Sequence, residues 1–110
     1  MVTLIGMGSG RWEALSVQAQ DAVRRAGLVF GAKRLLAGLP PECTARQFAL
    51  YQPAEILETL AQAPGQDAAV LYSGDTGFYS GASGLLTPLR ALGIPARVYP
   101  GVSSIQLLAA

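Results

Sequence analysis

The chain has 110 residues, of which 51% are hydrophobic and 14% are charged, whereas an average soluble domain carries roughly 25% charged residues. This apolar composition excludes a disordered chain. Eight basic and seven acidic side chains give a formal net charge of +1 and form no basic stripe for a nucleic acid. The absence of histidine and the single cysteine, Cys43, exclude a histidine-based triad and an intrachain disulfide. We therefore expect no metal site and a cytoplasmic location.

The first part of the chain alternates apolar runs with amphipathic segments. Residues 2–5 are a run of branched apolar residues before the glycine loop 6–10, which predicts a buried strand. A helix is predicted over residues 15–26, because apolar residues recur there at helical spacing. A second strand at residues 28–30 and a short helix at residues 32–39, stopped by two prolines, repeat the pattern.

The middle of the chain continues this alternation. Phe48 and Leu50 indicate a short or edge strand within residues 42–52. Pro53 suits the first turn of a helix that ends before Pro64 and Gly65.

The last part of the chain contains two further strands. A strand is predicted at residues 68–72, and the glycine-rich residues 73–84 are interpreted as a loop. A helix with leucines follows over residues 85–92, which Pro88 should bend or delay, and the last strand covers residues 96–99.

Strands that alternate with helices of this length predict an α/β fold with a mostly parallel sheet of about five strands and helices on both faces. No apolar run approaches the roughly 20 residues of a membrane span, so we expect no membrane partner. A helix should open at Ser103 or Ser104, yet the apolar residues 105–110 end without a cap or charge. We expect a truncated domain, the alternative being an apolar C-terminus docked on the core.

Glycine-rich loops follow four of the predicted strands, at residues 6–10, 31–34, 73–77 and 100–104. Ligands of open parallel sheets bind beyond the carboxyl ends of the strands, where loops and helix N-termini offer free backbone donors. Each loop alone is explained by turn geometry. The four together favour a ligand site.

Two nucleotide-binding motifs fail on this sequence. Gly6 and Gly8 begin a dinucleotide fingerprint, but Arg11 stands where its third glycine belongs, and no acidic residue precedes Glu42 after the second strand. A P-loop is excluded because no glycine is followed by Lys-Ser or Lys-Thr. A nucleoside-like ligand held by main-chain groups remains, and S-adenosylmethionine fits this description.

The same loops carry a family resemblance that spans the whole chain. In order and spacing, the segments that begin at Val2, Leu28, Ser73 and Pro100 resemble the tetrapyrrole (corrin/porphyrin) methylase family. The sequence Gly-Ala-Lys-Arg-Leu-Leu from Gly31 and the loop after Ser73 look most like precorrin-6Y methyltransferases of cobalamin biosynthesis.

The resemblance implies a two-domain enzyme of which residues 1–110 are the N-terminal domain, with S-adenosylmethionine in the cleft between the domains. It implies no catalytic residue that we can name. The residues that it implies for cofactor binding are Gly8, Ser9, Ser73, Gly74, Asp75, Phe78, Ser103 and Ser104. Many members carry proline where Ser9 stands, and Asp75 has an alternative role in stabilising a turn.

The implied reaction is transfer of a sulfonium methyl group to a carbon of a precorrin-type tetrapyrrole. Because that substrate carries many carboxylates, the cations Arg11, Lys33 and Arg34 are candidate substrate-binding residues, unless they are merely solvated. Tyrosines beside strand ends could stack on the macrocycle, although such rings more often belong to the core. They are Tyr51, Tyr72, Tyr79 and Tyr99.

Other functions stay open at this point. Uroporphyrinogen, diphthine and ribosomal RNA methyltransferases share these glycine loops, and a cofactor-binding module without catalysis is a rival from another class. A site shared between two domains also predicts an exposed apolar surface on the isolated chain, and therefore a homo-oligomer.

Overall fold

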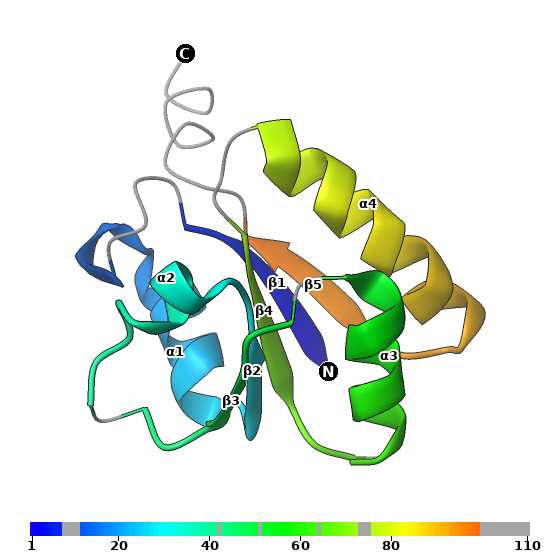
Figure 1. The fold of residues 1–110 in the computed structure, drawn as a ribbon, viewed down its shortest axis with the longest axis horizontal. Coiled ribbons are helices and arrows are strands. Elements are labelled where there is room, and N and C mark those ends of the chain that lie inside the picture. Colours follow the sequence, from blue (N-terminus) through cyan, green and yellow to red (C-terminus); the bar gives the residue numbers. More distant parts are fainter. Residues whose placement is uncertain (8–11, 42, 51, 64, 73–75, 100–110) are drawn as a thin grey trace.

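A five-stranded parallel sheet forms the centre of the molecule (Figure 1). The computed structural model describes residues 1–7, 12–41, 43–50, 52–63, 65–72 and 76–99. The strands are β1 (Val2–Gly6), β2 (Leu28–Phe30), β3 (Arg46–Phe48), β4 (Ala68–Tyr72) and β5 (Ala96–Tyr99). Their spatial order is β3-β2-β4-β1-β5, and every neighbouring pair is parallel. The predicted α/β class and strand positions are confirmed.

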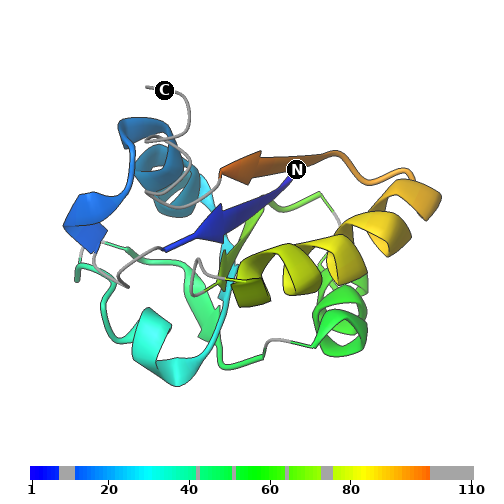
Figure 2. The same ribbon diagram turned by 90° about the horizontal axis from the view of Figure 1, so that it is seen from above.

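Helices cover both faces of this sheet, as Figures 1 and 2 show. One face carries α1 (Val17–Arg25) and α2 (Lys33–Leu36), and the other carries α3 (Pro53–Ala61) and α4 (Thr76–Ala91). A short 3-10 helix, η1 (Trp12–Ala14), precedes α1. This arrangement follows from right-handed crossovers, since the chain moves in one direction along the sheet through β2 and β3 and returns through β4 and β5.

The core has two layers, one on each side of the sheet. Strand β1 is buried along its whole length, and its side chains alternate between the layers. Val2 and Leu4 pack with the buried leucines of α4, whereas Ile5 and Met7 pack with Val23 of α1. Burial on both faces explains why the central strands are continuous apolar runs rather than alternating patterns.

The helix boundaries differ from the prediction in three places. Helix α1 begins at Val17, because the Ser16 side chain caps it by accepting a hydrogen bond from the Ala19 amide at 3.2 Å. Helix α2 is shorter than predicted, covering only Lys33–Leu36.

The largest difference concerns α4. Residues 76–84 were expected in a loop, but they form the first half of this helix, and Pro88 lies inside it. Burial of Leu85 and Leu89 against the sheet outweighs the low helix propensity of the glycines. The predicted end of this helix is confirmed, since Gly93 follows it with a φ of 73°.

Candidate functional site

The carboxyl ends of four strands meet at one edge of the sheet, which we call the carboxyl rim (Gly6, Met7, Gly31, Tyr72 and Tyr99). Gly6 is paired with Tyr72, and Ile5 is paired with Tyr99. The Met7 amide donates a hydrogen bond of 2.7 Å to the Tyr72 carbonyl, which extends the pairing of β1 and β4 one residue beyond β1. The loops predicted to bind a ligand therefore start from neighbouring points.

Most of the predicted cofactor residues lie just beyond the part of the chain that the structure describes. These are Gly8, Ser9, Ser73, Gly74, Asp75, Ser103 and Ser104, together with Arg11 of the predicted substrate set. Phe78 lies in α4, for which the backbone is described at this point. The structure describes the residues on both sides of 8–11 and of 73–75, and Tyr99 before residue 100.

Helix α4 begins at Thr76, four residues after Tyr72. The first turn of a helix has amide groups without partners inside the helix, and these amides attract negatively charged ligand groups. Because α4 starts from the carboxyl end of β4 (Figure 1), its amide donors lie beside the rim. This position suits the carboxylate of an amino-acid-like ligand.

Gly31 closes the rim between β2 and β4. It is buried, and its amide donates a hydrogen bond of 3.2 Å to the Phe48 carbonyl. A Cβ atom built on Gly31 would lie 3.1 Å from the Cβ of Leu71. Only glycine therefore lets the chain pass this close to β4 without moving it.

Lys33 and Arg34 open helix α2 two residues after this glycine, and both are exposed. Neither forms an ion pair with another residue that the structure describes. Their charges remain available to a carboxylate-bearing ligand that reaches the rim from the side of α2.

Tyr72 does not present its ring for stacking on a ligand. Its side chain is only 9% exposed and packs in the core layer beside α3 and α4, and burial raises the pKa of its phenol to about 12. Tyr99 is half-buried against the opposite layer, where the Arg97 guanidinium donates a hydrogen bond of 3.2 Å to its hydroxyl. Tyr51 and the side chain of Tyr79 lie outside the described residues.

Trp12 is a residue of this region that the sequence analysis missed. It is 9% exposed, and its carbonyl accepts a hydrogen bond of 3.0 Å from the Gln20 side chain. The available signal was its position, since the single tryptophan of the chain stands immediately after the first glycine loop.

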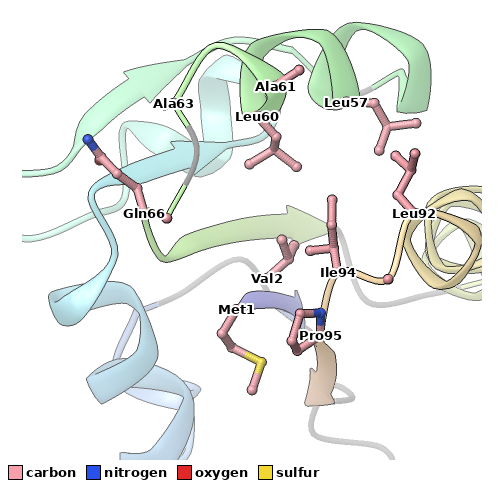
Figure 3. Close-up of a pocket in the computed structure, with 12 residues that line it drawn as sticks. Met1, Val2, Leu57, Leu60, Ala61, Ala63, Gln66, Leu92, Ile94 and Pro95 are labelled. Carbon is pink, nitrogen blue, oxygen red and sulfur yellow. The ribbon is translucent and has the colours of Figure 1, made fainter.

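An apolar hollow lies at the other end of the sheet, where the strands begin (Figure 3). Its volume is about 370 Å³. Leu57 and Leu60 of α3 point into it, as does Leu92, which directly follows α4. The hollow carries no charged side chain among its lining residues. Its walls therefore do not match a ligand with a carboxylate, an amino group and a sulfonium.

Within residues 1–7, 12–41, 43–50, 52–63, 65–72 and 76–99, no three His, Cys, Asp or Glu side chains gather where they could hold a metal ion. In the same part of the chain, no helix has the length and apolar character needed to cross a membrane.

Comparison with family models finds one match that spans residues 1–110, described as Tetrapyrrole (Corrin/Porphyrin) Methylases. A precorrin-4 C(11)-methyltransferase of Mycobacterium tuberculosis is 33% identical over 99% of this chain and 46% of its own length. A cobalt-precorrin-4 C(11)-methyltransferase of Methanocaldococcus jannaschii is 26% identical over 94% of this chain and 43% of its own length. The chain thus spans about half the length of the curated relatives it matches.

A solved structure gives the same fold. The X-ray structure of a cobalt precorrin-4 methyltransferase, described as a cobalamin biosynthetic enzyme, matches with a TM-score of 0.71 and 22% identity. The match covers 94% of this chain and 46% of the other. At this identity the likeness establishes the fold. The relatives named here are precorrin-4 enzymes, so they support the predicted family and not the predicted precorrin-6Y type.

Proposed function

This chain belongs to the tetrapyrrole (corrin/porphyrin) methylase family, and we propose on that premise that it supplies the N-terminal half of an S-adenosylmethionine-dependent methyltransferase. The carboxyl rim carries this proposal, because it brings together the starting points of the glycine loops. The second half of the enzyme would come from a further domain, as the chain's share of its relatives' length suggests.

The described rim fits the cofactor in its chemistry. Main-chain amides at the start of α4 suit the carboxylate of S-adenosylmethionine. Gly6 and Gly31 keep the strand ends free of side chains. We assign cofactor contacts to Gly8, Ser9, Ser73, Gly74, Asp75, Phe78, Ser103 and Ser104, as the resemblance implies.

The reaction would be an in-line displacement. Bound S-adenosylmethionine would supply an electrophilic methyl group to a ring carbon of the substrate, with S-adenosylhomocysteine as the leaving group. The substrate carbon would then lose a proton to solvent or to a base not yet assigned. The chain contributes by orienting the two reactants and excluding water, which accelerates such transfers without a strong base. Lys33, Arg34 and Arg11 would hold substrate carboxylates.

Two precorrin substrates are supported by different observations. The curated relatives named above favour methylation of a precorrin-4-type macrocycle at C11. The Gly31 loop and the loop after Tyr72 favour the precorrin-6Y type. Incubating the full-length protein with each precorrin and labelled S-adenosylmethionine, followed by mass spectrometry of the tetrapyrrole, decides between them.

Gly74→Val tests the cofactor site itself. A valine side chain should fill the space where the backbone approaches the ligand. Calorimetry on the full-length protein should detect binding of S-adenosylhomocysteine to the wild type and none to the folded variant. Unchanged affinity of Gly74→Val for S-adenosylhomocysteine would show that residues 73–78 do not form the site. A wild type that binds S-adenosylhomocysteine but methylates neither precorrin would favour a cofactor-binding module without catalysis.

A further inference from the structure

Both ends of the first glycine loop are attached to the same core layer. Gly6 belongs to β1, and Met7, directly before residues 8–11, is fully buried and donates a hydrogen bond of 2.7 Å from its amide to the Tyr72 carbonyl. Trp12 follows the loop and packs in the same layer as Met7, Ala19 and Val23. Met7 and Trp12, which stand on either side of residues 8–11, are therefore both held by the core.

Helix α1 holds Trp12 with two side chains that lie one turn apart. The Gln20 side-chain amide donates a hydrogen bond of 3.0 Å to the Trp12 carbonyl, across eight residues of sequence. The Arg24 guanidinium carbon lies 5.5 Å from the centroid of the Trp12 ring, within the range of a cation–π contact. Because residues four apart share one face of a helix, Gln20 secures the backbone of Trp12 while Arg24 covers its ring.

The orientation of Arg24 is itself supported. Asp21, on the preceding turn, lies 3.5 Å from the Arg24 guanidinium. The Trp12 carbonyl also accepts a hydrogen bond of 3.1 Å from the Leu15 amide, which joins η1 to the start of α1. Trp12 is thus fixed through its carbonyl, its ring and its burial.

We propose that Gln20 and Arg24 are positioning residues for the cofactor loop, acting through Trp12. This inference rests on the proposed function, because it takes residues 8–11 to contact S-adenosylmethionine. Ordering a loop around a ligand costs conformational entropy, and fixing the end of the loop in advance lowers that cost. We call the contacts of Gln20 and Arg24 with Trp12 the clamp. Its loss should weaken cofactor binding and leave the chemical step unchanged, since neither side chain is assigned a contact with the cofactor or the substrate.

Gln20→Met provides the test, because methionine matches glutamine in length and helix propensity but cannot donate the hydrogen bond. In the full-length protein, we expect the affinity for S-adenosylhomocysteine to fall and the KM for S-adenosylmethionine to rise by about threefold to tenfold, the range of one lost hydrogen bond, with kcat unchanged. Gln18→Met is the matched control, since Gln18 lies exposed on the same helix. Gln20→Lys keeps a donor of similar reach and should restore affinity to within about twofold of the wild type.

The possible results separate this inference from the proposed function. Equal affinities of Gln20→Met and Gln18→Met would overturn the clamp while leaving the cofactor site intact. So would a fall in kcat at constant KM, or a failure of Gln20→Lys to restore affinity. If neither the wild type nor Gln18→Met binds S-adenosylhomocysteine, the proposed function is refuted, and so is the positioning role of Gln20 and Arg24.

Discussion

Gly31 shows at the scale of one residue why the chain needs glycine at the end of β2. A Cβ atom at this position would lie 3.1 Å from the Cβ and 3.4 Å from the carbonyl oxygen of Leu71, which belongs to the central strand β4. Gly31→Ala should therefore lower the free energy of unfolding by about 1–3 kcal/mol through overpacking. Urea denaturation of the wild type and the variant measures this difference.

Gly84→Ala is the matched control for that prediction. A Cβ atom at Gly84 meets nothing closer than the Pro53 side chain at 3.5 Å, and the residue lies within α4. Alanine should therefore stabilise the protein by about 0.5–1 kcal/mol, because it loses less backbone freedom than glycine on folding. Equal effects of the two substitutions would contradict the close approach of Gly31 to β4.

Tyr72 couples the stability of the fold to pH. Burial raises the pKa of its phenol from 10.0 to about 12 in the folded protein, because the charged form is poorly solvated there. The stabilisation associated with the neutral phenol is complete below pH 10 and is lost as the pH rises toward 12, by up to about 3 kcal/mol.

Urea denaturation between pH 8 and 11.5, with Tyr72→Phe as the reference, isolates this contribution from the other titrating groups. The wild type should lose stability faster than Tyr72→Phe above pH 10. Parallel curves for the two proteins would show that the Tyr72 phenol ionises as easily in the folded protein as in the unfolded chain.

At the scale of secondary structure, the start of α1 depends on Ser16. Its hydroxyl accepts the hydrogen bond from the Ala19 amide that the first turn would otherwise leave unpaired. Ser16→Ala should lower the free energy of unfolding by about 1 kcal/mol, whereas Ser16→Asp, which retains an acceptor, should leave it nearly unchanged. Thermal unfolding followed by circular dichroism distinguishes the two. If Ser16→Ala left the stability unchanged, packing alone would fix the start of α1.

The elements also show what the amino-acid sequence could and could not predict. The strands were predictable because β1 and β4 are apolar runs buried on both faces, and because Phe48 marked the edge strand β3. The start of α4 could not be predicted, because its glycines have low helix propensity. This helix depends on contacts of Leu85 and Leu89 with residues distant in the sequence.

The candidate site was predictable only in its position. Loops that follow parallel strands reach one edge, and the structure places Gly31, Lys33 and Arg34 there. The role of Tyr72 in the core and the contact of Gln20 with Trp12 depend on side-chain packing between segments, which no local pattern encodes. The contacts of the remaining site residues with a cofactor stay predictions.

For the whole molecule, a site completed by a second domain predicts the behaviour of residues 1–110 alone. This chain should fold, because it has two packed core layers, but it should not methylate a precorrin, because half of the binding contacts would be missing. We also expect a dimer or larger species, because the surface that the second domain would cover is exposed when that domain is absent.

Light scattering over a dilution series and a methyl-transfer assay with each precorrin test these two expectations. A strictly monomeric chain would count against the exposed interface. Measurable turnover by residues 1–110 alone would refute the requirement for a second domain.

We propose that the cofactor binds at the carboxyl rim and not in the apolar hollow at the opposite end of the sheet (Figure 3). Hydrogen–deuterium exchange of the full-length protein with and without S-adenosylhomocysteine compares the two ends directly. We predict slower exchange in peptides that contain Met7, Trp12 and the start of α4, with no change in those that contain Leu60, Gln66 and Leu92. Protection confined to the peptides around the hollow would contradict the account.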